Sequence, residues 1–382
     1  MHIIPKYFIV FLMIILCSCS QSPQKTAYFK MDTLAEITLF DNKNSKIKND
    51  EVLKKIENFI DEWDARFSPD AENSEISRCN NRQSDTLEIS SDLFDMLKIS
   101  LFYGEKLDGY FDVSIKPLKD FWKISSRDSL LPDPNDSAIL DDLNEVLQKI
   151  NYKKISILEE PKRVIFENPE TKIDLGAVAK GFAIGKIRDT LQNYGFQNFI
   201  INVGGDIFIS GRKNGGKAII AGIRNPQGDG LLKSFATDGG AVFTSGNYER
   251  FRIAKSGARV HHIFDVKTGF SVSKNVSLTI TGKNPAVADI LATGLFAFPA
   301  DSILVKIKEF DGYEAFVVDS SGTTFETDFF IGKCCFMPKF EQILTLKKCR
   351  RHIETFFAYS PTSNGAKDYM DVANELERKI KQ

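Results

Sequence analysis

Asp289 and Thr293 stand four residues apart inside an apolar run that extends from Val287 to Phe298. A carboxylate in such a run is costly to bury unless it has a partner. Residues four apart on a helix share one face, so the carboxylate and the hydroxyl would point at the same object. Two hard oxygens suit Mg²⁺, which takes one or two protein carboxylates and otherwise binds water and substrate phosphates. The alternative is a structural helix whose Asp289 caps a neighbouring loop and whose Thr293 bonds its own backbone.

A second candidate is the segment from Lys172 to Gly181, where an expected strand ends at Asp174 and a helix is expected to begin at Gly176. A helix N-terminus offers free N–H groups and a positive dipole, so it favours phosphate. Lys180, in the first turn, adds a full positive charge within reach of the same anion. The alternative is an ordinary strand-to-helix turn with a solvated lysine.

The sequence GYFDVS, from Gly109 to Ser114, places Asp112 directly after Tyr110 and Phe111. An aromatic ring can stack on a flat ligand, and a carboxylate can accept hydrogen bonds from ring N–H groups. This pattern therefore suits an aromatic ligand, although the same residues would equally serve core packing.

Two loops and a pair of histidines complete the candidates. The glycines of NVGGD (202–206) allow either close backbone approach or a tight turn. The hydroxyls and Arg250 of TSGNYER (244–250) suit polar ligand groups or a plain hairpin. His261 and His262 are adjacent on an expected strand and point to opposite faces, so at most one faces a pocket.

The start of the chain predicts export. Residues 7–16 form an apolar segment that is too short to span a bilayer but has the size of a signal-peptide core. It ends in LCSC, which resembles the bacterial lipobox. That resemblance implies that Cys19 carries a lipid, that residues 1–18 are removed and that residues 19–27 form a polar tether. The alternative is an ordinary secreted protein cleaved nearby.

The composition predicts a folded domain rather than a disordered or nucleic-acid-binding chain. The net charge is −1 and 42% of the residues are hydrophobic. The cysteines outside the export signal show no zinc-ligand spacing. An oxidising compartment would allow Cys334 or Cys335 to bridge to Cys349, and the sequence leaves this open.

Several expected strands are joined by short turns rather than helices, which favours an α+β fold with largely antiparallel sheets and packed helices. Residues 120–142 are polar and contain two prolines, so they predict a surface excursion. Residues 333–382 are basic and helix-prone and form an appended tail. Strands are expected at 31–40, 155–158, 163–167, 198–203, 218–223, 240–244, 276–281 and 315–318, and helices at 51–67, 91–107, 176–194, 285–298 and 302–309.

Eight segments, in this order along the chain, resemble the ApbE family of FAD:protein FMN transferases. They span residues 28–331, and we define the expected catalytic domain as 28–332. The segments are Met31-Asp-Thr33, Ser74 to Asn80, GYFDVS, IDLGAVAKG, NVGGD, TSGNYER, His262 to Gly269 and Asp289 to Thr293.

The resemblance implies a T-fold-like flavin-binding domain, Mg²⁺ dependence and a lipid-anchored protein outside the cytoplasm. It implies cleavage of FAD, transfer of FMN through a phosphoester to a Thr or Ser of an exported partner, and release of AMP. By motif, the metal ligands would be Asp289, Thr293 and the carbonyl of Ala177, and His262 and Asp289 would be catalytic. The FAD site would comprise Met31, Tyr110, Phe111, Asp112, Asp174, Lys180 and Phe264. Asp32 departs from the family pattern, which has glycine after the first Met.

The resemblance also implies a separate acceptor protein. Acceptors of the family carry a sequence of the type Asp-x-x-(Ser/Thr)-Gly-Ala-Thr, as in subunits of membrane electron-transport complexes, and this chain contains no such sequence. Two alternatives use the same pocket. One is an FAD pyrophosphatase that releases FMN and AMP, and the other is a non-catalytic flavin-binding lipoprotein.

Overall fold

The computed structural model describes residues 22–40, 42–69, 71–124 and 130–331. The predicted signal peptide, Cys19 and the basic tail with its three cysteines lie outside these ranges. Cys79 lies inside them and is a buried free thiol. No helix within them has both the length and the apolarity of a membrane span.

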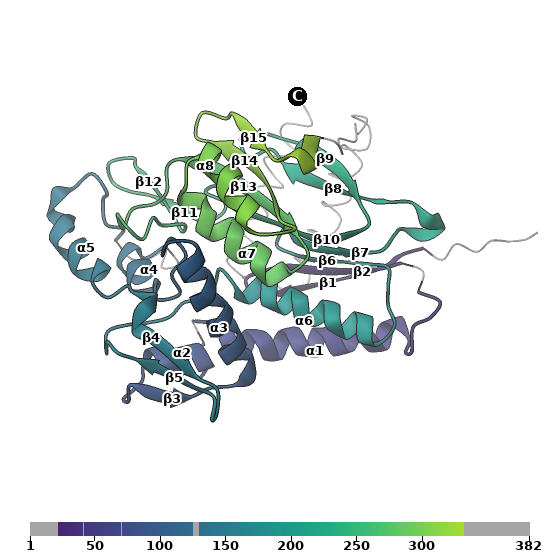
Figure 1. The fold of residues 1–382 in the computed structure, drawn as a ribbon, viewed down its shortest axis with the longest axis horizontal. Coiled ribbons are helices and arrows are strands. Elements are labelled where there is room, and N and C mark those ends of the chain that lie inside the picture. Colours follow the sequence, from purple (N-terminus) through teal and green to yellow (C-terminus); the bar gives the residue numbers. More distant parts are fainter. Residues whose placement is uncertain (1–21, 41, 70, 125–129, 332–382) are drawn as a thin grey trace, which may run out of the picture.

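An eight-stranded sheet forms the centre of the molecule, and every neighbouring pair in it is antiparallel (Figure 1). Side chains alternate between its faces, as period-two strands require; on the second strand Ala35, Ile37 and Leu39 are buried. The predicted α+β class with antiparallel pairing is confirmed. In spatial order the strands are β1 (Gln24–Lys30), β2 (Thr33–Leu39), β6 (Phe199–Val203), β7 (Asp206–Ser210), β10 (Gly239–Gly246), β13 (Asn275–Gly282), β14 (Glu314–Asp319) and β15 (Thr324–Glu326).

The first strand corrects the predicted tether for residues 24–27. From Gln24 onward the chain pairs with β2 over the full length of β1. Polar residues do not prevent this, because an edge strand is commonly polar, and Tyr28 anchors β1 by donating to the Leu53 carbonyl at 3.1 Å. The predicted strand 31–40 starts two residues late, at Thr33, because Met31 and Asp32 adopt positive φ and form the turn.

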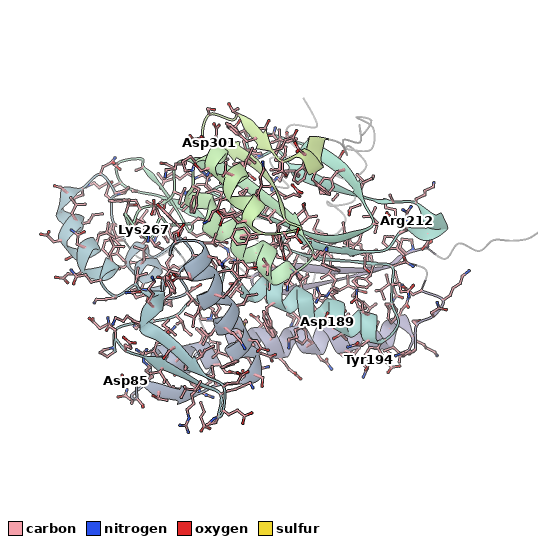
Figure 2. All side chains as sticks on the ribbon, viewed as in Figure 1. Asp85, Asp189, Tyr194, Arg212, Lys267 and Asp301 are labelled. Carbon is pink, nitrogen blue, oxygen red and sulfur yellow. The ribbon has the colours of Figure 1, made fainter. Side chains whose placement is uncertain are left out.

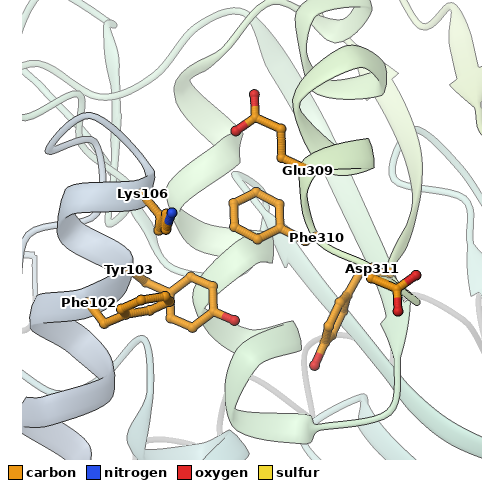
Figure 3. A pocket seen from close by; sticks show the side chains of 7 residues that line it. Phe102, Tyr103, Lys106, Glu309, Phe310 and Asp311 are labelled. Atoms are coloured by element: carbon orange, nitrogen blue, oxygen red, sulfur yellow. The ribbon is translucent and has the colours of Figure 1, made fainter.

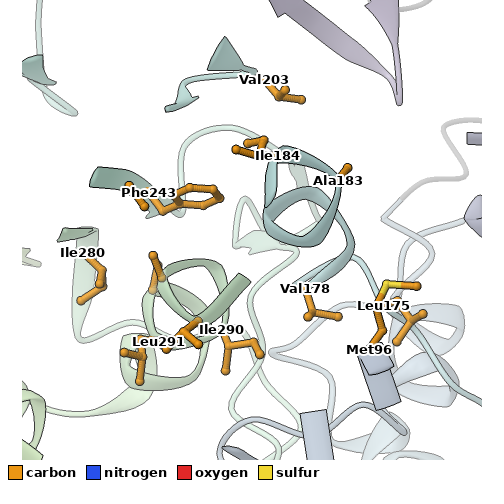
Figure 4. Packing of buried hydrophobic residues seen from close by; sticks show 14 of the residues in the cluster. Met96, Leu175, Val178, Ala183, Ile184, Val203, Phe243, Ile280, Ile290 and Leu291 are labelled. Atoms are coloured by element: carbon orange, nitrogen blue, oxygen red, sulfur yellow. The ribbon is translucent and has the colours of Figure 1, made fainter. Parts of the chain in front are cut away.

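Helices cover one face of the sheet. The predicted helices are present, although the one expected to begin at Gly176 begins at Ala179. In Figure 4, apolar side chains of α6 and α7 meet those of β10 and β13 between these layers. Val52, Ile56, Ile60 and Trp63, which recur at helical spacing, lie on the buried face of α1. The helices are α1 (Asn49–Phe67), α2 (Glu75–Asn80), α3 (Ser91–Lys106), α4 (Lys116–Trp122), α5 (Leu140–Leu147), α6 (Ala179–Asn193), α7 (Pro285–Gly294), α8 (Ala300–Lys306) and α9 (Asp328–Ile331).

Smaller elements enclose the rest. A β8–β9 hairpin and α9 cover the opposite sheet face with a second apolar cluster. A three-stranded sheet, in the order β3-β5-β4, lies beside α2 and α3 (Figure 1). A two-stranded ribbon, β11–β12, packs against α4 and α5. Their bounds are β3 (Thr86–Glu88), β4 (Ile155–Leu158), β5 (Arg163–Phe166), β8 (Ile219–Arg224), β9 (Leu231–Thr237), β11 (Phe251–Ile253) and β12 (Arg259–His261), with short 3₁₀ turns η1 (Ser137–Ile139), η2 (Tyr152–Lys154), η3 (Asn214–Gly216), η4 (Leu295–Ala297) and η5 (Ile307–Glu309).

The predicted surface excursion at 120–142 is wrong for two of its residues, Trp122 and Leu131. Trp122 ends α4, is fully buried and donates its indole N–H to the Gly269 carbonyl at 2.7 Å. Leu131 is also buried in the cluster that α4, α5 and the β11–β12 ribbon share. Tertiary packing, which local polarity cannot reveal, draws these two apolar residues inward.

Candidate functional site

Asp289 lies where α7 crosses the start of α6. Its Oδ2 accepts the main-chain N–H of Gly181 at 2.8 Å. Gly181 is the third residue of α6, and the N-cap residue Val178 supplies no capping side chain. A carboxylate at this position normally comes from the cap residue itself. Asp289 therefore caps α6 from another helix. The structural alternative, in which Asp289 caps a neighbouring segment, is observed, and the capped segment is a helix rather than a loop.

The crossing depends on a glycine. A β carbon at position 181 would lie 2.4 Å from the Pro285 carbonyl oxygen and 2.8 Å from Cβ of Asp289. No side chain fits there without moving one helix away from the other. The glycine of IDLGAVAKG thus brings the α6 backbone against α7.

A lysine and two carboxylates meet beside this crossing. Lys180 pairs with Oδ2 of Asp206, the first residue of β7, and Asp206 Oδ1 accepts the Thr244 N–H at 3.0 Å. Burial alone would lower the pKa of the Lys180 ammonium, but the carboxylates of Asp206 and Asp289 outweigh it and raise that pKa. Burial raises the pKa of the Asp289 carboxyl, and the negative charge of Asp206 raises it further. Lys180 and the Gly181 N–H lower this pKa, but they do not cancel the rise. Asp289 thus lacks full compensation for its charge.

The start of α6 does not present the free donors that the sequence predicts for a phosphate. The N–H groups of Val178 and Ala179 both bond the Leu175 carbonyl, at 3.0 and 2.8 Å. The Gly181 N–H is taken by Asp289. These three N–H groups are already bonded inside the protein. The prediction that they bind a phosphate is therefore wrong.

The Ala177 carbonyl is a free acceptor just before α6. Ala177 precedes the N-cap residue Val178, and the first N–H groups of a helix have no carbonyl partner within it, so the Gly181 N–H is available to Asp289. No donor in the described part of the chain bonds the Ala177 carbonyl, and its oxygen remains available as a ligand.

Thr293 lies one turn beyond Asp289 and faces β10, where its Oγ1 is 3.3 Å from Oγ of Ser245. Asp289, Thr293 and the Ala177 carbonyl thus offer one carboxylate and neutral oxygens, a set that suits Mg²⁺. Within the described ranges no three His, Cys, Asp or Glu side chains cluster as a metal site. The raised pKa of Asp289 fits the same ion, because a cation would compensate its buried charge.

Lys119, on α4, pairs with Asp174 and also exerts its positive charge on His262. Its Nζ lies 2.7 Å from Asp174 Oδ1, which also accepts the Gly176 N–H at 2.8 Å. Burial would raise the pKa of Asp174, but Lys119 and the Gly176 N–H outweigh it, so the pKa is lowered. Asp174 is an ionised anchor, and its lysine also acts on the imidazole of His262.

The imidazole of His262 has a defined orientation. Its main-chain N–H and its Nδ1 both contact the Arg250 carbonyl, each at 3.1 Å. A carbonyl oxygen only accepts, so the ring proton resides on Nδ1 and Nε2 keeps a lone pair. Burial and the positive charges of Lys119 and Arg250 lower the pKa of His262 to about 3. His261 instead is buried and contacts the Val272 carbonyl through Nε2 at 2.7 Å.

The GYFDVS segment uses most of its polar groups internally. Asp112 accepts both the N–H and the hydroxyl of Ser114, at 2.8 and 2.6 Å, and the Tyr152 N–H at 3.0 Å. Phe111 is buried in the main core. Tyr110 is half-buried, with the Lys267 ammonium 5.4 Å from its ring centroid. Tyr110 and Asp112 keep partial exposure, whereas Phe111 is buried. The predicted ligand roles of Phe111 and Asp112 coexist with core packing and a hydrogen-bonded turn.

The two remaining predicted FAD contacts lie on other elements. Phe264 is buried and stacks on Trp122, with centroids 6.3 Å apart. Met31 is half-buried in the β1–β2 turn, and its N–H donates to Asp64 at 3.4 Å. Their roles toward FAD stay predictions. Lys267 lies in the loop after β12, far along the molecule from Asp189 at the C-terminal end of α6 (Figure 2).

A groove of about 280 Å³ lies between the C-terminal end of α3 and the segment after α8 (Figure 3). None of its lining residues is a predicted site residue, so we keep it separate from the Asp289 site. Its walls are Phe102, Tyr103, Lys106, Glu309, Phe310, Asp311 and Tyr313.

The model of the ApbE family matches residues 31–317. The chain belongs to the ApbE family. Among its relatives, the FAD:protein FMN transferase of Treponema pallidum is 28% identical over 283 residues, which cover 70% of this chain and 76% of that protein. The FAD:protein FMN transferase of Haemophilus influenzae is 26% identical over 282 residues, covering 72% and 80%.

The fold of the ApbE family is also found in solved structures. The ApbE protein of Thermotoga maritima has a TM-score of 0.75 and 25% identity, covering 82% of this chain and 100% of that chain. The flavin transferase ApbE of Vibrio cholerae, at 22% identity, has a TM-score of 0.70 over 82% and 100%. The predicted family and fold class are confirmed.

Several ApbE site residues were not predicted. Asp206 lies in NVGGD, a motif that the sequence singled out without assigning this side chain. The hydroxyls of TSGNYER were assigned only to polar ligand groups in general, and the place of Ser245 beside Thr293 was not predicted. The acidic residue after two glycines was the available signal for Asp206. Lys119 and the Arg250 carbonyl carried no signal, because only the fold brings them to Asp174 and His262.

Proposed function

We propose that this protein is an Mg²⁺-dependent FAD:protein FMN transferase that acts on an exported partner protein. The oxygen of a Thr or Ser hydroxyl attacks the FMN phosphorus of FAD. The new oxygen–phosphorus bond replaces the bond to the bridging oxygen, which leaves with AMP. The products are a protein with FMN in phosphoester linkage, AMP and one proton.

The orientation of His262 is the observation that carries this proposal. With Nδ1 held by the Arg250 carbonyl, Nε2 keeps a lone pair that can accept the proton of the attacking hydroxyl. A low pKa keeps the ring neutral, hence available as an acceptor, across the physiological range. The negative charge of a bound pyrophosphate would raise that pKa and strengthen the base.

The predicted ligand set supports a metal role for Asp289, Thr293 and the Ala177 carbonyl. When bound there, Mg²⁺ would neutralise charge on the phosphates and on departing AMP. Lys180 adds a positive charge beside the same place, while Asp206 fixes its ammonium. Lys119 and Asp174 form a second ion pair, just before α6.

The test is an acceptor assay with FAD and Mg²⁺. Two acceptors are used: a recombinant folded domain that carries an Asp-x-x-(Ser/Thr)-Gly-Ala-Thr sequence, and a short peptide of that sequence alone. Mass spectrometry should find covalent FMN on the Thr or Ser, with one AMP released for each FMN attached. Free FMN and AMP without labelled acceptor would identify an FAD pyrophosphatase. Retention of intact FAD without AMP release would identify a flavin-binding lipoprotein.

We also propose that the protein is anchored through a lipid on Cys19, with its catalytic domain outside the cytoplasm. The support is the LCSC sequence at the end of the apolar segment. This location would place the enzyme beside exported acceptors such as subunits of membrane electron-transport complexes.

A further inference from the structure

The first strand limits how far the folded domain can stand from Cys19. β1 begins at Gln24, five residues after Cys19, and pairs with β2 from its first residue. A fully extended chain advances at most about 3.6 Å per residue, so Gln24 lies within about 18 Å of Cys19. If Cys19 carries the proposed lipid, the end of the sheet that contains Gln24 must lie close to the membrane surface.

Two loops that are bonded to a common residue lie at that end of the sheet. Loop 42–48 follows β2, whose last residue pairs with the first residue of β1. Loop 211–217 follows β7. The Asn198 carbonyl accepts the side-chain amide of Asn42 at 3.2 Å, and Asn198 Oδ1 accepts the Arg212 N–H at 2.9 Å. The two loops therefore form one surface beside the start of β1.

The charged side chains of these loops are all positive. We call the surface formed by loops 42–48 and 211–217 the basic end, and it carries six exposed basic side chains and no Asp or Glu. The whole chain has 50 basic and 51 acidic residues, so an even mixture would place both signs here. The six residues are Lys43, Lys46, Lys48, Arg212, Lys213 and Lys217.

Neighbouring carboxylates neutralise only part of this charge. Asp238 pairs with Arg212. No carboxylate of the described residues forms an ion pair with Lys48, Lys213 or Lys217. An excess of positive charge therefore faces solvent. The acidic residues that adjoin the two loops are Asp238, Asp50, Glu51 and Asp41, of which Asp41 lies outside the described ranges.

The opposite end of the molecule carries both signs. There α5 exposes three acidic residues, and the β11–β12 ribbon that packs beside it exposes Lys255 and Arg259. Figure 2 shows Arg212 and Tyr194 at one end of the molecule and Lys267 at the other. The basic end is thus distinguished by its single sign of charge, and it is the end that Cys19 can reach.

The candidate site lies away from the basic end. α6 carries Lys180 in its first turn and ends at Asn193, whose carbonyl accepts from the Lys46 ammonium at 2.9 Å. A helix rises 1.5 Å per residue, so Lys180 and Asn193 are about 20 Å apart along its axis. Asp206 likewise begins β7, whereas loop 211–217 follows the other end of that strand. A membrane at the basic end would therefore leave the candidate site open to solvent.

Building on the proposed lipid anchor, we propose that the basic end binds the anionic headgroups of the membrane. Each Lys or Arg close to an anionic bilayer strengthens binding by roughly fivefold. The lipid tethers the domain, and the basic end orients it so that the candidate site stands about 20 Å from the membrane surface. The enzyme then serves acceptor hydroxyls that project from membrane complexes, rather than hydroxyls at the level of the headgroups.

The first test measures vesicle binding by the full-chain variant Cys19→Ser, so that no lipid on the protein contributes. Vesicles of phosphatidylcholine with one third phosphatidylglycerol are compared with phosphatidylcholine alone, by cosedimentation at low salt. The protein should bind only the anionic vesicles, and added salt should release it. In the same background, Lys213→Gln with Lys217→Gln should weaken binding by about 25-fold, from roughly fivefold per lysine.

Lys123→Gln with Lys255→Gln is the matched control. Both lysines are exposed, one at the C-cap of α4 and the other in the β11–β12 turn, and the change in net charge is the same. Charges farther from the bilayer than about 10 Å are largely screened, so binding should stay within about twofold. Circular dichroism verifies that both double variants are folded.

The second test addresses orientation with the wild type on anionic vesicles. An acceptor peptide is attached to a lipid of the same vesicle, either directly at the headgroup or through a linker longer than about 20 Å. Labelling of the directly attached peptide should be at least about tenfold slower, because it does not reach the site.

Several outcomes would overturn the inference. Equal weakening by both double variants, or equal binding to neutral vesicles, would remove the basic end from lipid binding. Equal labelling of the two attached peptides would contradict the orientation. A loss of transfer to the folded acceptor domain without vesicles, in Lys213→Gln with Lys217→Gln, would assign the surface to a protein partner. Failure of the wild type to label either peptide would instead refute the proposed transferase function, on which the vesicle-binding test does not depend.

Discussion

The carboxylate of Asp289 on α7 and the main-chain N–H of Gly181 on α6 are joined by a 2.8 Å hydrogen bond. Through this bond Asp289 caps α6, which is a structural role. We propose that it also binds the metal. The Ala177 carbonyl, which precedes the N-cap of α6, accepts no hydrogen bond in the described part of the chain and is a further oxygen that we propose for the metal. One contact thus couples the helix crossing to the geometry of the candidate metal site.

Gly181→Ala should therefore damage both stability and activity. The new methyl group would meet the Pro285 carbonyl and Asp289, so α6 and α7 must separate. We expect a loss of about 1–3 kcal/mol in the free energy of unfolding, typical of overpacking. Urea denaturation followed by circular dichroism measures it, and AMP release should fall in parallel.

Gly185→Ala, one turn further along α6, is the control for that variant. A β carbon there would lie 3.5 Å from Cγ of Pro285, an ordinary contact. Because alanine favours a helix, this change should be neutral or stabilise by about 0.5 kcal/mol. Equal destabilisation by both variants would show that helix crossing distance is not the cause.

Asp289→Asn should separate the capping role of this residue from its proposed role as a metal ligand. The amide oxygen still accepts the Gly181 N–H, so α6 remains capped, while the negative charge that would bind a cation is gone. Mg²⁺-dependent AMP release should fall by about 100-fold or more, the scale of losing one electrostatic contact to a transition state. Asp289→Ala also removes the cap and should cost about 1 kcal/mol of stability. Turnover that Asp289→Asn leaves unchanged would exclude the carboxylate from the site.

The sequence predicts the regular elements well where a side-chain pattern alone determines them. The apolar face of α1, ending at Trp63 and Phe67, follows from helical spacing. The sequence does not predict features that depend on contacts between segments far apart in the chain. The edge strand β1 is polar and forms only because β2 pairs with it. Trp122 is buried in a core that also needs Gly269, the acceptor of its indole N–H, 147 residues later in the chain.

The candidate site likewise has residues that a local pattern predicts and contacts that only the fold creates. Asp289 and Thr293 are recognisable because a carboxylate and a hydroxyl interrupt an apolar run at helical spacing. The contact of Asp289 with Gly181 could not be predicted, because 108 residues separate them. Lys119 is likewise 55 residues from Asp174, whereas the Arg250 carbonyl is only 12 residues from His262, across the β11–β12 ribbon. Long-range partners of this kind set protonation and orientation, and no local pattern encodes them.

Cys19→Ser tests the predicted lipid anchor. If Cys19 is the lipidated residue, the variant should incorporate no labelled lipid and should appear in the soluble fraction. Its catalytic domain is unchanged, so transfer to the acceptor peptide should proceed at the normal rate. Lipid incorporation that persists in Cys19→Ser would contradict the lipobox interpretation.

His262→Asn tests the base. The amide nitrogen of Asn lies where Nδ1 of the imidazole lies, so the contact with the Arg250 carbonyl can be kept while the Nε2 lone pair is removed. FMN transfer should fall by about 10²- to 10⁴-fold, the usual contribution of a general base. FAD affinity, measured by quenching of flavin fluorescence, should change little. A variant that keeps full kcat would show that another group takes the proton.

The same variant should change how stability depends on pH. The folded protein holds His262 with a pKa lowered to about 3, chiefly by burial, whereas an unfolded histidine titrates near about 6.5. Between these values the unfolded chain binds the extra proton, so stability from this residue is complete above about pH 6.5 and falls as the pH drops toward 3. The loss is at most about 1.4 kcal/mol per pH unit. Urea unfolding at pH 7.5 and pH 5 should therefore show a larger decline for the wild type than for His262→Asn, and parallel declines would mean that His262 is not held neutral in the folded protein.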